Sequence, residues 1–185
     1  FTGEYCYYED STGYIMATDS ALVIDYSQAD TMFAHADTFK IFTYNIDTDS
    51  VYRIMHGYHH MRVFHNDVQA VCDSMVYDSR DSLLIMYQDP ILWQAGQQQL
   101  GEEIRMFFGN GNIDSVQVLR QALSVERIDS IHYNQVSGHE MHSYFREGEL
   151  YLTTSVGNVF VNYFPFDEDS VMIEMNHTET SLLKM

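Results

Sequence analysis

The sequence predicts an all-β fold, on the basis of three observations. Its apolar runs are short, rich in aromatic and β-branched residues, and often alternate in period two, as at 159–164. Turn-forming pairs such as Asp-Ser and Asn-Gly recur at short intervals, whereas the chain has only 2 prolines. Similar segments also recur some tens of residues apart, which is typical of stacked units that bury their apolar faces against one another. An elongated surface or trough is therefore expected.

The repeat consists of three segments, each of which is predicted to open a hairpin-like stretch. These segments are residues 17–23, 71–77 and 137–141. The hairpins are expected to turn at Asp30-Thr31, Asp81-Ser82 and Glu147-Gly148, because such pairs tolerate a positive φ or hydrogen-bond their own backbone. An apolar or alternating run follows each turn, at 32–33, 83–86 and 150–152. Antiparallel strands joined by tight turns are the predicted result.

The remaining elements are also predicted to be strands and turns. Further turns are expected at 45–49, 110–112 and 146–149, and a further strand at 91–93. Segment 113–131 is the strongest helical candidate, but its apolar residues fit a period of 3.6 only in part. Its valines fit a strand equally well, so near-complete β structure is the better interpretation.

Composition and charge narrow the classes of function. The chain has 185 residues, of which 45% are hydrophobic, so it is long enough to bury a core. It carries 27 acidic residues against 9 basic ones, which gives a formal net charge of −18. Nucleic acids and anionic membrane surfaces are normally bound through clustered Lys and Arg. A nucleic-acid partner is therefore not expected.

The chain shows no boundary between domains, and residues 1–185 are predicted to form a single elongated β domain built from loose repeats. It begins at Phe1 without an initiator Met and stops at Lys184-Met185 within a pattern. We therefore expect it to be a segment of a longer chain.

Several segments share their order and residue types with a known family. In the first part of the chain these are 34–37 (AHAD), 71–77 (VCDSMVY), 87–93 (YQDPILW) and 96–104; later ones are 134–141 (NQVSGHEM), 157–159 (GNV) and 163–165 (YFP). Together they cover nearly the whole chain and resemble the OstA-like family of bacterial envelope proteins, in the version typical of Bacteroidetes-type bacteria. The chain is richer in aromatic residues and Met than the short bridge protein of that family.

This resemblance implies both a fold and a function. The implied fold is an antiparallel β-jelly-roll, a twisted V or taco-like shape whose stacked sheets enclose an apolar interior. The implied function is binding and transport of lipopolysaccharide or lipooligosaccharide in the periplasm of the Gram-negative cell envelope. Acyl chains would lie in the apolar trough while the sugar-phosphate head group stays outside. The implied protein partners are other β-jelly-roll proteins of the transport system, joined by edge-strand pairing, and further copies of this chain.

A lipid with acyl chains requires a continuous apolar surface shielded from water, at about 0.8 kcal/mol per buried CH₂. Strand alternation selects the side chains that point inward. The inward candidates for lipid contact are Val71, Met75, Leu83, Ile85, Tyr87, Ile91, Trp93, Ile104, Met106, Met141, Leu150, Leu152, Val159 and Val161. The same residues would equally serve to fill the core of any β sandwich. Among these residue types, the 11 Met side chains point most to lipid contact, because flexible thioethers adapt to a mobile ligand.

Several groups of His, Cys and acidic residues could suggest a metal site or an acid–base site, but each has a simpler explanation. The histidines at positions 56, 59, 60 and 65 lie near Cys72 and Asp73, but His59 and His60 would face opposite ways on a strand. His35 with Asp37, and His139 with Glu140 and His142, invite an acid–base role, yet no nucleophile accompanies them. We expect no catalytic site, no metal site and no cofactor. Cys6 and Cys72 either pair in an oxidising compartment or remain two separate thiols.

Three functions are thus open. A non-enzymatic lipid-transport module leads, a structural or scaffold protein of the envelope without lipid cargo is second, and an envelope enzyme is third. The scattered positions of the seven arginines argue against a tight phosphate site.

Overall fold

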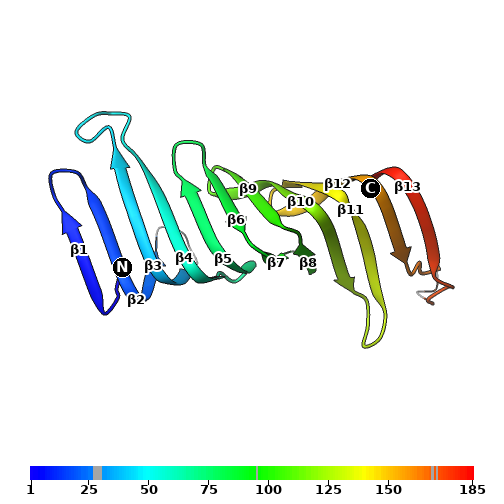
Figure 1. Cartoon of the computed structure of the whole chain (residues 1–185). Coiled ribbons are helices and arrows are strands. Elements are labelled where there is room, and N and C mark those ends of the chain that lie inside the picture. Colours follow the sequence, from blue (N-terminus) through cyan, green and yellow to red (C-terminus); the bar gives the residue numbers. More distant parts are fainter. Residues whose placement is uncertain (27–30, 95, 168, 170) are drawn as a thin grey trace.

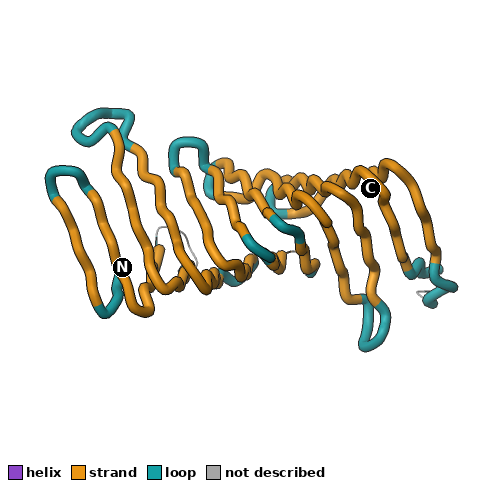
Figure 2. Tube along the Cα trace, viewed as in Figure 1, coloured by secondary structure: helices purple, strands orange, loops and turns teal. Residues whose placement is uncertain are grey.

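The computed structural model describes residues 1–26, 31–94, 96–167, 169 and 171–185. Those residues contain no helix and form thirteen strands of a single sheet, so the all-β prediction is confirmed (Figures 1 and 2). It follows that the described part of the chain has no helix that could span a membrane. The strands are β1 (Tyr5–Glu9), β2 (Tyr14–Asp25), β3 (Met32–Tyr44), β4 (Tyr52–Phe64), β5 (Val68–Asp78), β6 (Leu83–Tyr87), β7 (Ile91–Gln94), β8 (Gln97–Leu100), β9 (Glu103–Gly109), β10 (Asn112–Arg127), β11 (Tyr133–Arg146), β12 (Glu149–Tyr163) and β13 (Asn176–Lys184).

The sheet is an antiparallel meander that runs along the length of the molecule (Figure 1). Its main path is β1-β2-β3-β4-β5-β6-β9-β10-β11-β12-β13. In the middle, β7 pairs with β5 and β8, and β8 pairs with β10, which closes a ring of six strands, β5-β6-β9-β10-β8-β7. β1 and β13 are the two end strands, and their outer edges have no neighbouring strand among the described residues.

Pairs of residues with positive φ interrupt β2, β4, β10 and β12 near their middle, and one such pair separates β6 from β7. Among the described residues outside the hairpin turns, these pairs are Asp19-Ser20, His59-His60, Gln88-Asp89, Arg120-Gln121 and Gly157-Asn158. In β2, Thr18 pairs with Thr38 and Ala21 with Ala36, so two residues lie opposite one. An extra residue of this kind is a β-bulge, which bends the strand. Each long strand therefore has two halves, one on either side of its bend.

Each of the three repeated segments lies in the first strand of an antiparallel pair of consecutive strands, as predicted, and each also contains a bend. Residues 17–23 lie in β2, 71–77 in β5 and 137–141 in β11, and each segment spans a shift in strand register. Left-handed conformations are uncommon for residues other than Gly, but Asp, Asn and His are the most tolerant. This tolerance fits Asp19, His59, His60 and Asn158, which have a positive φ at the bends.

Most of the predicted turns are confirmed. The chain turns at Asp81-Ser82 between β5 and β6 and at Glu147-Gly148 between β11 and β12, and it turns again within 45–49 and at Asn110-Gly111. Both Glu147-Gly148 and Asn110-Gly111 have two consecutive positive φ angles, as a two-residue hairpin loop requires. The turn expected at Asp30-Thr31 includes a residue outside the described part. Segment 113–131 is mainly strand, because β10 runs to Arg127.

The buried core lies on one face of the sheet, which we call the inner face. It is one cluster that extends from Ala17 in β2 to Val159 in β12. In β4, a Cβ on Gly57 would meet the Sδ of Met61, which follows the bend of the same strand. The inner faces of the two halves of β4 therefore face each other close to the bend.

Candidate functional site

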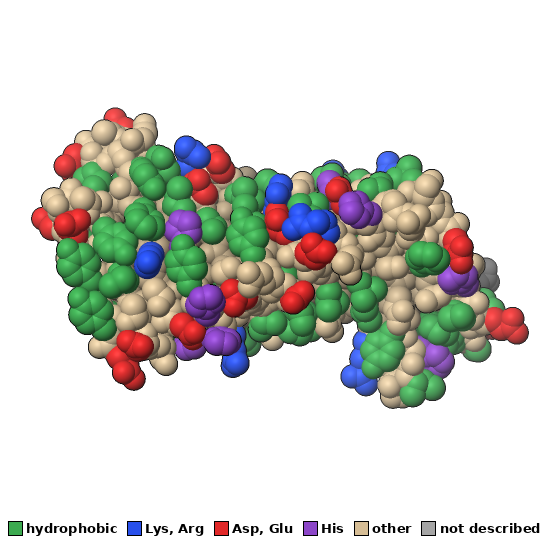
Figure 3. Space-filling model, viewed as in Figure 1, with side chains coloured by type: hydrophobic (Ala, Val, Ile, Leu, Met, Phe, Trp, Pro, Cys, Tyr) green, Lys and Arg blue, Asp and Glu red, His purple; other side chains and the backbone are tan. Residues whose placement is uncertain are grey.

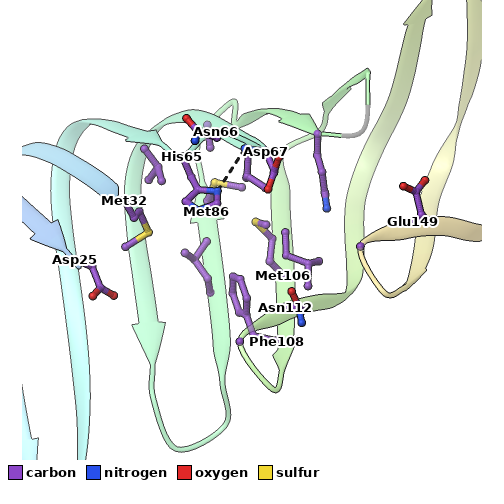
Figure 4. A pocket seen from close by; sticks show the side chains of 18 of the residues that line it. Asp25, Met32, His65, Asn66, Asp67, Met86, Met106, Phe108, Asn112 and Glu149 are labelled. Carbon is purple, nitrogen blue, oxygen red and sulfur yellow. Dashed lines mark hydrogen bonds between the residues drawn. The ribbon is translucent and has the colours of Figure 1, made fainter. Parts of the chain in front are cut away.

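A cavity of about 700 Å³ lies in the middle of the molecule, against the inner face. This volume is within the range typical of sites for small organic ligands. One part of its wall comes from Val63 of β4 and from Val68 and Ala70 of β5. Another part comes from β6 and β9, which place Met86, Met106 and Phe108 in the cavity (Figure 4). Its walls are therefore mainly apolar.

Strand register explains why these side chains meet. Leu84 of β6 pairs with Met106 of β9, and Met86 pairs with Ile104. Because side chains alternate between the two faces of a strand, Leu84 and Met86 share the inner face. Met86 and Met106 are only 1% and 3% exposed, so thioethers line the cavity where it meets the core.

The cavity has polar groups around part of its lining. His65, Asn66 and Asp67 come from the turn between β4 and β5, and Asp67 donates its backbone N–H to Nδ1 of His65 at 3.4 Å. Asp25, Asn112 and Glu149 lie on other elements around the same space (Figure 4). The cavity thus combines an apolar wall with a polar border that includes three carboxylates.

The predicted inward residues divide into two groups. Seven of the fourteen lie on the inner face: Met75, Ile104, Met106, Met141 and Val159 are buried, and Leu150 and Val161 pack against the buried cluster. Of these seven, Met106 lines the cavity. The structure thus brings these seven together along the core.

The other seven lie on the opposite, outer face. Val71, Leu83, Ile85, Tyr87, Ile91 and Leu152 are half-buried, and Trp93 is 38% exposed. Their neighbours along the strands, such as Met86, Leu92 and Thr153, are the residues on the inner face. For these seven positions the prediction was therefore wrong by one residue along the strand. Segment 83–87 is apolar throughout, and such a run does not indicate which face is buried.

The sequence reasoning also missed most residues of the cavity wall. Val63, Val68, Ala70, Leu84 and Phe108 were not among the candidates, although they line the cavity. A signal was available for Val68 and Ala70, because they alternate with the polar residues Gln69 and Asp67. Leu84 had no such signal.

The histidine cluster forms separate pairs at the bends. His60 Nδ1 lies 2.9 Å from Oδ2 of Asp37, and His59 Nδ1 lies 3.1 Å from Oδ1 of Asp73. His56 stacks on Tyr58 with 5.8 Å between ring centroids, and burial lowers the pKa of His56 below its usual value, with Lys40 adding to the effect. Within the described residues, no three His, Cys, Asp or Glu side chains are grouped to hold a metal ion.

The two cysteines are separate free thiols in this structure. Cys6 is exposed in β1, whereas Cys72 is half-buried in β5 and packs against the core. Burial raises the pKa of the Cys72 thiol to about 12. The open choice between a disulfide and two thiols is thereby resolved in favour of thiols in this conformation.

Several arginines are held by carboxylates of the chain itself. Arg120 pairs with Glu102 at 2.7 Å and with Glu103 at 3.2 Å, and Arg105 pairs with Glu103 at 2.6 Å. Arg80 pairs with Asp78 and Asp81 in the turn after β5. These guanidinium groups are therefore already engaged and do not form a cluster around the cavity.

An aromatic surface covers the outer face near the N-terminus (Figure 3). Tyr7, Tyr14, Phe42 and His56 form a row across β1 to β4, with 6.1, 5.1 and 5.7 Å between successive ring centroids. Tyr44 stacks on Tyr52 at 4.9 Å. Cross-strand aromatic pairs of this kind stabilise a sheet.

Comparison with known proteins adds no family assignment. No protein-family model matches the chain, and no curated protein sequence matches it.

Proposed function

We propose that this chain is a periplasmic module that binds lipopolysaccharide or lipooligosaccharide and carries its acyl chains in the apolar interior toward the outer membrane. The observation that carries the proposal is the cavity of about 700 Å³ on the inner face, walled by Val63, Val68, Met86, Met106 and Phe108. Such a space shields acyl chains from water, at about 0.8 kcal/mol per buried CH₂. Its thioethers adapt to chains that move.

We also propose a specific shape for this module. In it, the two halves of the bent strands are the two sheets of a taco-like β-jelly-roll, and the cavity is the widest part of the trough between them. The OstA-like resemblance of the sequence supports this interpretation, and so does the contact between Gly57 and Met61 across the bend of β4.

The end strands would join the module to its neighbours. β1 and β13 end the sheet, and an unpaired strand edge invites pairing with another strand. The proposed partners are other β-jelly-roll proteins of the transport system, or further copies of this chain. Head-group binding would be weak, because Arg80, Arg105 and Arg120 are already paired with carboxylates.

A scaffold protein without lipid cargo is the second candidate. The close packing of the core outside the cavity favours it: Phe39 and Ser155 are each 0% exposed, and Met141 is 1% exposed. Occupancy of the cavity by acyl chains distinguishes the two functions.

The test is to fill the cavity. Ala70 is 4% exposed and lines the cavity, so Ala70→Phe places a ring in it, while Gln69→Phe places the same ring on the outer face of β5. We expect fluorescent lipopolysaccharide to bind the wild type and Gln69→Phe alike, and Ala70→Phe at least tenfold more weakly. Equal binding by both variants, or none by the folded wild type, would overturn the proposal.

A further inference from the structure

A second cavity, of about 390 Å³, lies at one end of the closed ring of strands, next to the first cavity. Trp93 of β7 lines it and pairs with Gln69 of β5 on one side and with Gln98 of β8 on the other. Gln98 also pairs with Val125 of β10, so these side chains form one row across the strands. Leu92, next to Trp93, is buried on the inner face. The row therefore belongs to the outer face of the sheet.

Two aromatic rings are exposed at this cavity. Trp93 is the only tryptophan of the chain and is 38% exposed. Tyr133 also lines the cavity and is 37% exposed. It pairs with Arg127, which lies two residues beyond Val125 and therefore on the same face. An indole or phenol ring offers a flat apolar face and a polar atom at its edge, so both rings are available to a ligand.

Side-chain amides lie beside these rings. Asn66, Gln69 and Gln98 line the cavity, and no group in the described part of the chain hydrogen-bonds their amides. Asn66 and Gln69 are exposed and Gln98 is half-buried, so a ligand in the cavity can reach them. Each amide has two N–H donors and a carbonyl acceptor. These groups suit a ligand that both donates and accepts hydrogen bonds, as a hydroxyl does.

The charges at the cavity are balanced, although the whole chain has a formal net charge of −18. Among the described residues that line it, only Asp67 and Arg127 are charged. Phosphate sites normally combine charge-assisted hydrogen bonds from Arg or Lys, and here a carboxylate accompanies the one guanidinium. A cationic ligand would meet Arg127 as a like charge. The lining therefore fits a neutral ligand better than an anion or a cation.

We propose that this cavity binds a neutral saccharide, whose sugar ring packs its C–H face on Trp93 and whose hydroxyls exchange hydrogen bonds with Gln69 and Gln98. A pyranose ring has an apolar face of C–H groups and a rim of hydroxyls, so it matches an aromatic face bordered by amides. A volume of about 390 Å³ suits a mono- or disaccharide. The inference goes beyond the proposed function, because the site lies outside the interior assigned to acyl chains.

Trp93 makes the test direct, because the only tryptophan of the chain is its only source of indole fluorescence. The full chain is titrated with the neutral disaccharides cellobiose, lactose, maltose and N,N′-diacetylchitobiose, and with sorbitol as a polyol without a ring. We expect at least one disaccharide to change the emission of Trp93 in a saturable way, and sorbitol not to do so. Glucose 6-phosphate and choline are the charged comparisons. No saturable change with any disaccharide, or stronger binding of a charged ligand, would overturn the proposal.

Three variants locate the site, by calorimetry with the disaccharide that binds. Trp93→Leu removes the aromatic face and should weaken binding at least about tenfold. Gln98→Leu removes one amide and should weaken it about 3- to 10-fold, as one net hydrogen bond allows. Gln117→Leu removes the same amide from the outer face of β10, between the buried Val116 and Val118, and should bind as the wild type does. Wild-type affinity in folded Trp93→Leu, or equal affinity of Gln98→Leu and Gln117→Leu, would overturn the site.

The outcomes also separate this site from the proposed function. Residue 70 lines the interior cavity but not this one, so Ala70→Phe should bind the disaccharide as the wild type does. Trp93→Leu should in turn keep its affinity for fluorescent lipopolysaccharide. Loss of disaccharide binding in folded Ala70→Phe would place the sugar in the interior and overturn the outer site. Disaccharide binding by a wild type that does not bind lipopolysaccharide would support this site and count against the proposed function alone.

Discussion

Gly57 lies against Met61 across the bend of β4, so closely that a Cβ on residue 57 would overlap the Sδ of Met61. The same Cβ would lie 3.0 Å from Cε1 of Phe39, which is fully buried. Glycine at this position therefore allows the two halves of the strand to approach at the bend. Close approach of this kind is one reason for Gly inside a strand.

The first prediction concerns this contact. Gly57→Ala should lower the free energy of unfolding by about 1–3 kcal/mol, because it overpacks the core beside Met61 and Phe39. Urea denaturation measures the loss. In the double variant Gly57→Ala/Met61→Ala the total loss should be smaller than the sum of the two single losses, since removing the thioether makes room for the methyl group. Additive losses would show that the two residues do not interact.

The second prediction tests which residues of β6 face the core. Met86 is 1% exposed on the inner face, whereas its neighbour Ile85 is half-buried on the outer face. Met86→Ala should cost about 2–5 kcal/mol in urea denaturation. Ile85→Ala should cost clearly less, because it removes fewer buried contacts. A larger loss for Ile85→Ala would mean that Ile85, and not Met86, faces the core.

This neighbouring pair also shows where sequence reasoning reaches its limit. The fold class and the turns at Asn110-Gly111 and Glu147-Gly148 were predictable, because they depend on local chemistry. Which residues of β6 face the core was not predictable, since residues 83–87 are apolar on both faces of the strand. Only the pairing of β6 with β5 and β9 determines which face is buried.

The bends were not predictable for a related reason. His59-His60 and Asp19-Ser20 carry residues typical of turns, yet they lie inside long strands. Their conformation is imposed by the register on either side, which a local pattern does not contain. The cavity was missed for the same reason: its walls come from strands that meet only in the fold, and Leu84 has no distinctive signal in the sequence.

The third prediction concerns the two thiols. With a pKa of about 12, Cys72 at pH 8 is thiolate in only about one molecule in 10,000, and the thiolate is the reactive form. In the native protein a thiol reagent should therefore modify Cys6 rapidly and Cys72 hardly at all, whereas both should react in urea. Cys6→Ser should remove the rapid phase. Rapid modification of Cys72 in native Cys6→Ser would contradict the packing described for β5.

The fourth prediction concerns Asp129 in the turn between β10 and β11. Its Oδ1 accepts hydrogen bonds from the backbone N–H groups of Ile131 and His132, each at 2.8 Å, and its Oδ2 lies 2.7 Å from Nδ1 of His132. These bonds favour the ionised carboxylate and lower the pKa of Asp129 to about 2 from 3.8.

A lowered pKa stabilises the folded chain at a pH above the unfolded value, and this contribution disappears as the pH falls through the folded value. The urea midpoint of the wild type should therefore exceed that of Asp129→Asn at pH 5 and above. The difference should shrink between about pH 4 and pH 2. A difference that is constant over this range would show that the carboxylate charge does not stabilise the turn.

The measurement that tests the account most directly is photocrosslinking of lipopolysaccharide from neighbouring positions of one strand. A photoreactive side chain is placed at Leu84, which lines the cavity, or at Ile85, on the outer face of the same strand. We predict lipopolysaccharide adducts at Leu84 and none at Ile85. Adducts at Ile85 alone, or at neither position in a folded protein, would contradict transport of acyl chains through the interior.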